Sequence, residues 1–259
     1  EGVTLVGASW VGIENFKTVT QGVDFWKSVG NTFFYALSLP VCLVISLVVS
    51  FLLTKNVKGK KLFRTIYFIP YVCSVVAVVL MWGWIFNPTY GVINNLMYEF
   101  GYEGERIQWV SEEKYYRILV LVMGIWGGCG YSIILYSAAL TNVNSTFYEA
   151  AKIDGATGWK RELYVTIPMV KPTLKTVTTL AATSGFLLYN EVFFLTNGAA
   201  GTKSISYIIR ELAITSTRTQ YARANTIGAV QILIGLALVG IINVAFREWD
   251  FKRKNGGDA

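Results

Sequence analysis

The residue types that usually carry catalysis or hold metal ions are scarce in this sequence of 259 residues. It contains no histidine, which excludes a His-based triad, an imidazole proton shuttle and a His-ligated metal. Cys42, Cys73 and Cys129 lie far apart in apolar runs and form no CxxC pair. They predict neither a zinc site nor a disulfide framework, and buried thiols are the expected state. We therefore expect no catalytic residue, no metal site and no cofactor bound by this chain.

A phosphate-binding loop of the GxxxxGK[ST] type is also missing from the sequence. The nearest candidate is Gly59-Lys60-Lys61, where Thr54 occupies the position of the first glycine and Lys61 that of the serine or threonine. The chain therefore cannot cradle ATP phosphates by that route.

Glu191 is the only acidic residue inside a long apolar run. A charge at membrane depth is costly, so Glu191 should face a cavity or a partner, unless it is an interfacial carboxylate near the outer surface. Its neighbours Tyr189 and Asn190 offer an aromatic face and an amide, which are groups that bind sugars. Other residues that offer the same chemistry are Trp84, Trp126, Tyr131 and Ser132. For the aromatic ones, helix packing or an aromatic belt at the membrane surface is the alternative role.

Five apolar runs predict an all-α integral membrane protein. Hydrophobic residues make up 53% of the chain and charged residues only 15%, against about 25% charge in a soluble domain. A helix needs about 20 apolar residues to cross a bilayer, and the bilayer core forces its backbone groups to pair internally. Pro40 and Pro70 are expected to kink two of the spans. The predicted spans, within a membrane domain of residues 31–247, are Thr32–Leu53, Thr65–Phe86, Ile118–Leu140, Thr176–Gly198 and Ala224–Phe246.

Charge sets the expected orientation of these spans. The link Lys55–Arg64 carries five basic residues and no acid, which is typical of a cytoplasmic loop. Alternation then places two segments outside: residues 1–30, which are expected to form short interfacial helices, and residues 87–117. It places residues 141–172 and the tail 248–259 inside. The outer link Gly198–Arg223 is an exception, because it is rich in basic residues. The net charge of +7 belongs to these membrane flanks and does not indicate nucleic-acid binding.

Residues 141–172, which we call the inner link, are too long for a simple turn between helices. Thr146 and Glu149 have the spacing of a capping box, and Gly155 suits the left-handed residue after a short helix. A second helical turn and the prolines expected to end it are Trp159–Thr166, Pro168 and Pro172. The small residues and mixed charges of this helix-turn-helix favour a protein partner over lipid. A structured loop without a partner is the alternative.

The inner link resembles the EAA loop of binding-protein-dependent ABC importer permeases. That pattern is Glu-Ala-Ala, three residues, glycine, nine residues and then Ile-x-Leu-Pro, and here Val165 and Ile167 replace the usual Ile and Leu. The matching residues are Glu149, Ala150, Ala151, Asp154, Gly155, Ile167 and Pro168. The long pattern and its fixed spacing make the resemblance specific.

Further stretches resemble the sugar-permease branch, similar to the maltose and glycerol-phosphate permeases. They are WVGIENF at Trp10–Phe16, NTFFYA at Asn31–Ala36, FIPYV at Phe68–Val72, WGWIFNPTYGVIN at Trp82–Asn94 and LTNGAAGTKSISYIIRELA at Leu195–Ala213. In the last stretch Ala199-Ala200 replaces a usual Gly-Pro. Members usually carry one more span before the first stretch, and this N-terminal helix is expected to be absent here.

The resemblance implies a permease subunit in the bacterial plasma membrane, which moves a sugar or oligosaccharide inward by alternating access. It also implies the partners: a second homologous permease, two cytoplasmic ATPase subunits that hold ATP and Mg²⁺, and an extracellular solute-binding protein. The EAA loop would then dock on the ATPase and transmit its closure. The alternatives are an ion-coupled secondary transporter, which the single intramembrane acid disfavours, a membrane anchor for a cytoplasmic protein, and an ABC importer of a non-sugar solute.

Overall fold

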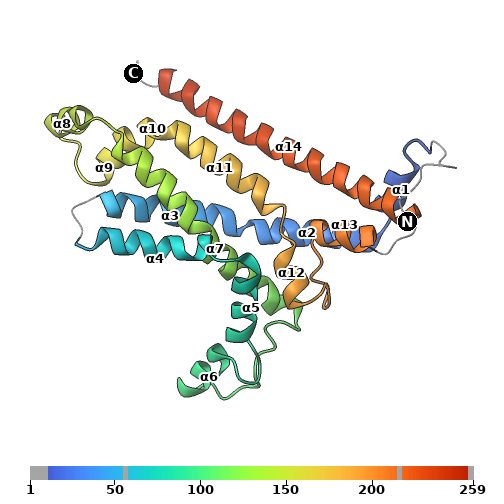
Figure 1. Ribbon diagram of the computed structural model, residues 1–259. Coiled ribbons are helices and arrows are strands. Elements are labelled where there is room, and N and C mark those ends of the chain that lie inside the picture. The colour runs from blue at the N-terminus through green and yellow to red at the C-terminus, as the bar shows by residue number, and fades with distance from the viewer. Residues whose placement is uncertain (1–10, 55–57, 215–217, 256–259) are drawn as a thin grey trace. The chain divides into compact units, whose positions relative to one another are not determined.

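The structure, a computed structural model, describes residues 11–54, 58–214 and 218–255. All regular elements in these residues are helices, which confirms the predicted all-α class (Figure 1). They are α1 (Glu14–Thr20), α2 (Val23–Ala36), α3 (Ser38–Thr54), α4 (Lys60–Val72), α5 (Val75–Ile85), α6 (Val92–Glu99), α7 (Glu113–Thr141), α8 (Ser145–Ile153), α9 (Trp159–Arg161), the π-helical η1 (Glu162–Thr166), α10 (Ile167–Met169), α11 (Lys171–Gly185), α12 (Asn190–Leu195), α13 (Ile205–Ile214) and α14 (Arg218–Asn255).

Within the described residues, three stretches are long and apolar enough to cross a membrane. They are Val23–Thr54, Glu113–Thr141 and Gln220–Arg247, and a fourth arises if α4 and α5 count as one interrupted span. The predicted span 176–198 is not one continuous helix, because α11 ends at Gly185 and α12 begins at Asn190. The sequence Thr183-Ser184-Gly185 explains the break, since all three residue types are poorer helix formers than alanine or leucine.

The predicted boundaries also shift at the prolines and at the C-terminus. Pro40 is the third residue of α3, and the helix is interrupted at Leu37, because proline cannot donate to the carbonyl four residues earlier and clashes with it. Pro70 lies inside α4, which ends two residues later. Helix α14 continues to Asn255, so most of the predicted tail 248–259 is helical, and residues 256–259 lie outside the described residues.

The chain divides into two compact units, each of which is described by itself. The first unit comprises the chain up to Leu37, Ser74–Met123 and Thr183–Leu238. The second unit comprises Ser38–Cys73, Gly124–Ala182 and the chain from Val239. The first unit has an apolar core formed by side chains of α2, α7 and α12. Its most deeply buried residues are Tyr35, Tyr116, Val120 and Val192. Its short helix α12 packs against α5, and α13 packs against α2.

A buried asparagine fixes the loop between α12 and α13 of the first unit. The amide nitrogen of Asn31 on α2 donates to the backbone carbonyls of Gly201 at 2.8 Å and Lys203 at 3.0 Å. Its side-chain oxygen accepts a hydrogen bond from Arg117 on α7 at 2.8 Å. Tyr207 holds the other end of the loop, where its hydroxyl donates to the Asn197 carbonyl at 2.7 Å. Burial raises the pKa of the Tyr207 hydroxyl, which keeps this donor protonated.

The second unit packs α3 closely against α7. The hydroxyls of Ser46 and Ser50 on α3 donate to the backbone carbonyls of Cys129 and Ile133 on α7, each at 3.1 Å. Such hydrogen bonds between spans satisfy polar groups that have no water partner in a bilayer. Gly124 allows the close approach, because a Cβ added there would lie 2.7 Å from the Ser38 hydroxyl. The glycine pair spaced by four residues on α7 therefore serves helix packing.

We expect the substitution Ala200→Gly to stabilise the protein by about 1 kcal/mol. Ala200 has a φ of +53°, and this left-handed conformation costs a residue with a Cβ about 1–2 kcal/mol. Glycine removes that cost but gains freedom in the unfolded chain, which offsets about 0.4–1 kcal/mol. Thermal unfolding of the purified protein in detergent measures the effect. Ala199→Gly is the matched control, and a midpoint for Ala200→Gly at or below that of the control contradicts the prediction.

Candidate functional site

The first helix of the inner link, α8, begins two residues earlier than the sequence predicts. Asn144 is its N-cap residue, and the Asn144 side-chain oxygen accepts a hydrogen bond from the Thr146 backbone N–H at 3.0 Å. The predicted capping box with Thr146 as the N-cap is therefore wrong. Asn144 has the extended backbone of an N-cap residue, and asparagine caps helices at least as well as threonine. Glu149 consequently has no capping role and is exposed on α8.

The end of α8 has the geometry that the sequence predicts. Gly155 has a φ of +76°, which is a left-handed conformation. The Ala156 N–H donates to the Ala151 carbonyl at 2.8 Å, and the Gly155 N–H to the Lys152 carbonyl at 3.2 Å. This pair of hydrogen bonds is a Schellman motif, which stops the helix and reverses the chain. Ala151 is buried, while Ala150, Asp154 and Gly155 are exposed.

Neither proline of the inner link ends the second helical turn. Helical structure continues from Trp159 through η1 into α10, where Pro168 is near the first position, and Pro172 is the second residue of α11. This differs from the expectation that both prolines end the second helical turn. For Pro172 the physical reason is that the first N–H groups of a helix have no partner within it, so proline costs no hydrogen bond there. Pro168 directly follows the π-helical η1, which is continuous with α10. Ile167, which begins α10, and Pro168 are both half-buried.

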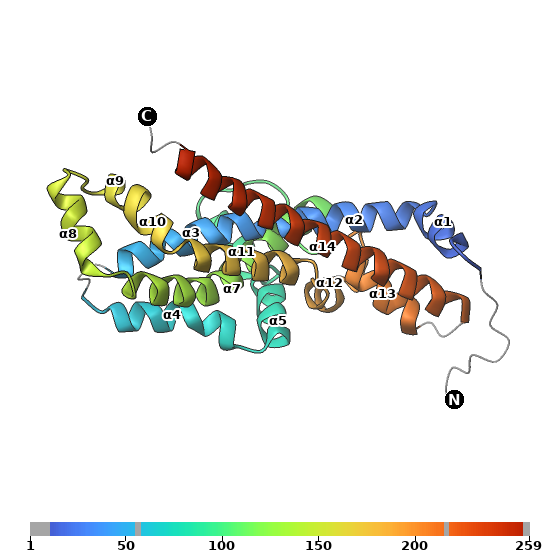
Figure 2. The same ribbon diagram turned by 90° about the horizontal axis from the view of Figure 1, so that it is seen from above.

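The two helical parts of the inner link, α8 and the segment that begins with α9, are in contact, and Figure 2 shows their backbones. Glu162 pairs with Arg161 at 2.5 Å and accepts a hydrogen bond from the Thr166 hydroxyl at 2.7 Å. The Arg161 guanidinium lies over the ring of Tyr148 on α8, 5.1 Å from its centre. A cation over an aromatic face is attractive. The inner link is thus a folded unit and not an extended connection.

Large apolar side chains of this link point into solvent within the second unit. Ile153, at the end of α8, is 88% exposed. The full set, which we call the apolar patch of the inner link, is Phe147, Ile153, Trp159, Leu163, Tyr164 and Met169. Exposed large apolar side chains gathered on one short segment indicate a protein contact.

The candidate path residues of the second unit lie on α7. Tyr131 stacks on Tyr71 of α4, with ring centres 5.0 Å apart and an angle of 21° between the rings. Ser132 is buried, and Trp126 is 38% exposed. One face of the Tyr131 ring is therefore occupied, as in the helix-packing alternative.

In the first unit, Tyr189 also uses its ring within the protein. Its ring stacks on Phe193 at 5.4 Å and on Tyr207 at 6.3 Å, and the Arg210 guanidinium lies 5.2 Å from its centre. Asn190 begins α12 and Glu191 follows it, both half-buried. The amide and the carboxylate therefore remain better candidates for solute contact than the tyrosine.

Trp84 lies in a different part of the same unit, at a cavity of about 330 Å³. This cavity is lined by α5 and α12 and includes Asn87, Tyr90 and Phe194. Trp84 is 59% exposed, and its ring centre lies 6.2 Å from that of Tyr90. The lining does not include Tyr189, Asn190 or Glu191.

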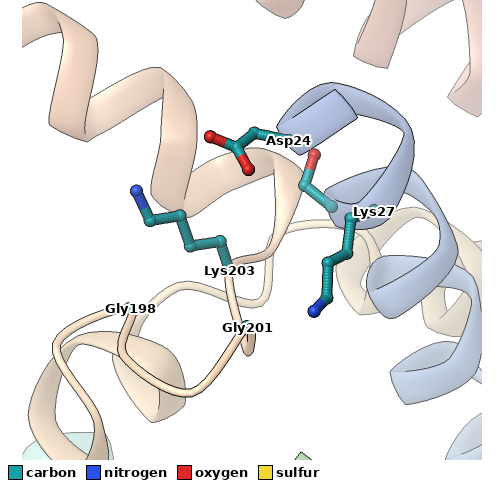
Figure 3. Close-up of a pocket in the computed structure, with 6 residues that line it drawn as sticks. Asp24, Lys27, Gly198, Gly201 and Lys203 are labelled. Atoms are coloured by element: carbon teal, nitrogen blue, oxygen red, sulfur yellow. The ribbon is translucent and has the colours of Figure 1, made fainter. Parts of the chain in front are cut away.

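A charged cavity that sequence reasoning missed lies between α2 and the loop after α12 in the first unit. Asp24 and Lys27 project from α2, and Lys203 from the loop (Figure 3). Lys27 pairs with Glu113 at 2.9 Å and Lys203 with Glu211 at 2.7 Å. The basic excess of the link Gly198–Arg223 was the available signal for it.

The comparison with known families decides which class of membrane protein this is. Residues 43–249 match the family described as binding-protein-dependent transport system inner membrane component. The chain belongs to this family. Members of this family are transport subunits and not enzymes, so this inner membrane component is a multi-pass permease of the bacterial inner membrane.

Two relatives of this inner membrane component are named as permease proteins. The chain is 33% identical to the lactose transport system permease protein of Rhizobium radiobacter, over 92% of this chain and 81% of that protein. It is 29% identical to a probable ABC transporter permease protein of Pyrococcus horikoshii, over 94% of this chain and 82% of that protein.

A solved structure of similar fold is the bacterial alginate ABC transporter in complex with an alginate pentasaccharide-bound periplasmic protein. The TM-score is 0.81 and the identity 24%, with 92% of this chain and 83% of that chain covered. The likeness shows that this inner membrane component shares its fold with a chain of that transporter.

Proposed function

We propose that this chain is the permease subunit of an ATP-driven importer and moves a sugar or oligosaccharide inward by alternating access. The observation that carries the proposal is the 33% identity to a lactose permease over 92% of the chain. The solved importer of similar fold also carries a saccharide, alginate. Cavities with amide and aromatic side chains, such as the one at Trp84 and Asn87, suit the hydroxyl groups and C–H faces of sugars.

The inner link is the proposed contact with a cytoplasmic ATPase. It is a folded helix pair with exposed apolar side chains, and the ordered turn at Gly155 holds α8 in place. Two ATPase subunits would hold ATP and Mg²⁺, while a second homologous permease would complete the membrane pathway. A solute-binding protein would deliver the sugar on the outer side, where the charged cavity at Lys27 and Lys203 is a candidate contact.

Reconstitution into liposomes tests the proposal. The permease, its partner permease and the ATPase are assembled in a membrane, and ATP hydrolysis is measured with the solute-binding protein, with and without saccharide. Saccharide-dependent stimulation of ATP hydrolysis and uptake of labelled sugar are the expected results. Uptake driven by a proton or sodium gradient without ATP would instead establish the secondary-transporter alternative. Stimulation only by amino acids would overturn the sugar assignment.

The double substitution Asn190→Leu with Glu191→Leu should impair uptake while keeping assembly and basal ATP hydrolysis. The amide would donate to sugar hydroxyls and the carboxylate would accept from them, and hydrogen bonds to a charged group contribute about 1.5–3 kcal/mol. Uptake at subsaturating sugar should therefore fall about tenfold or more. Asn95→Leu with Glu99→Leu on α6 is a matched control, because both residues are exposed. Unchanged uptake kinetics in the first double variant would assign Asn190 and Glu191 only an interfacial role.

A further inference from the structure

A basic cavity lies within the second unit, where the first turns of α11 approach the C-terminal part of α14 (Figure 1). It has a volume of about 620 Å³. Three cationic side chains line it, Lys171, Lys175 and Arg247, together with Asn243, Phe246 and two prolines. None of the described residues that line it is acidic. The described part of the lining therefore brings three basic side chains to one cavity.

Helix geometry places the polar side chains of the lining on one face of each helix. Lys171 and Lys175 are four residues apart on α11, so their side chains share one face of that helix. Asn243 and Arg247 are four residues apart on α14 and share a face in the same way. Phe246 packs against the apolar cluster that contains Val170 and Leu174. The cavity thus combines a charged rim with an apolar wall.

The depth of the cavity in a bilayer follows from the apolar stretch of α14. This stretch is Gln220–Arg247, so Arg247 marks its end and Asn243 lies one turn inside it. Side chains at this position lie at the boundary between hydrocarbon and headgroups, where long basic side chains extend toward the polar layer. A basic pocket beside a span at this depth has the chemistry of a site for lipid headgroups.

We propose that this cavity binds the phosphate-bearing headgroup of an anionic phospholipid. The cations of α11 and α14 would contact the phosphate, and the Asn243 amide would donate to the glycerol or headgroup oxygens. Phe246 and the prolines would contact the upper part of an acyl chain. A free phosphate ion would contact the same cations but has no apolar part to contact the apolar wall. A phospholipid is therefore the favoured ligand.

Native mass spectrometry of the purified, assembled transporter tests the site. The probe is dioleoylphosphatidylglycerol, with dioleoylphosphatidylcholine as the uncharged comparison and inorganic phosphate as a competitor. Each basic residue near an anionic lipid is worth about 1 kcal/mol, or about fivefold in affinity. Lys175→Gln with Arg247→Gln should therefore weaken phosphatidylglycerol binding about 25-fold. Asn243→Trp, which keeps all three cations and fills the cavity, should also weaken it.

The matched control removes two basic residues elsewhere. Lys60 and Lys61 are exposed at the start of α4, on the link that is predicted to share the cytoplasmic side, and neither lines the cavity. Lys60→Gln with Lys61→Gln should leave phosphatidylglycerol binding within about twofold, as expected for removal of exposed charges outside the site. An equal loss in this control, or normal binding in Asn243→Trp, would overturn the site. Displacement of the lipid by millimolar inorganic phosphate would overturn the lipid assignment. Assembly of each variant, followed by size-exclusion chromatography, confirms that the loss does not come from misfolding.

Discussion

Replacing Gly155 by leucine should reduce transport about tenfold or more and release the ATPase, while the permease stays in the membrane. The reason lies in the backbone, because a Cβ at Gly155 meets no atom within 4 Å, yet the residue has a φ of +76°. A left-handed conformation costs leucine about 1–2 kcal/mol, which is enough to shift the Schellman turn about tenfold toward other conformations. The end of α8 and the exposed Ile153 would then lose their fixed position. Transport, ATP hydrolysis and co-purification of the ATPase measure the outcome.

Two further variants distinguish the effect of the backbone turn from the effect of the exposed side chains. Gly155→Asn should keep most of the transport, because asparagine tolerates the left-handed conformation better than other residues with a Cβ. Ile153→Asp should weaken ATPase binding without disturbing the turn, because Ile153 is 88% exposed. Wild-type transport in Gly155→Leu, or a structure of the assembled transporter with the inner link free in solvent, would refute the proposed coupling role.

The substitution Gly130→Val should remove most of the folded permease from the membrane. A Cβ at Gly130 on α7 would lie only 2.2 Å from the backbone carbonyl oxygen of Tyr67 on α4, so backbone meets backbone at this point. Neither a rotamer change nor a shifted side chain can relieve this overlap, and α4 must move. Overpacking of this kind costs about 3 kcal/mol or more. The stack between Tyr71 and Tyr131, which begins one residue further along α7, should be lost with it.

Gly127→Val is the matched control for that prediction. It introduces the same side chain on the same helix, but a Cβ there meets no atom within 4 Å. Both variants carry the same change in helix propensity, so the difference between them isolates the contact with α4. The amount of monodisperse permease and its thermal unfolding in detergent provide the measurement. Equal yields and equal unfolding midpoints would show that α4 and α7 do not touch at Gly130.

The sequence predicts the long helices well and their interruptions less well. Helices α7 and α14 follow from long apolar runs that contain neither a charge nor a proline, and in a bilayer such runs must pair their backbone groups internally. The break between α11 and α12 was not predicted, because an average over 176–198 conceals a local run of weak helix formers. Asn144 and Thr146 both suit an N-cap, and only the backbone conformation distinguishes them.

In the candidate site, features set by local sequence could be predicted, and contacts between residues far apart in the chain could not. The turn at Gly155 was predictable, because few residue types accept a positive φ. The stacking of Tyr189 on Tyr207 was not, since the two residues come together only through the packing of α12 and α13. The role of Asn31 was equally hidden, because its partners Gly201 and Lys203 lie at least 170 positions along the chain.

That separation has a consequence for the order in which the protein is made. The ribosome synthesises Asn31 long before Gly201, which lies 170 residues later in the chain. The amide must therefore stay hydrated at the edge of the bilayer while the following helices are inserted, because an unpaired amide in hydrocarbon is costly. Only when the loop after α12 emerges can the carbonyls of Gly201 and Lys203 replace that water. Asn31 on α2 thus completes its hydrogen bonds only late in synthesis, after the loop that follows α12 has been made.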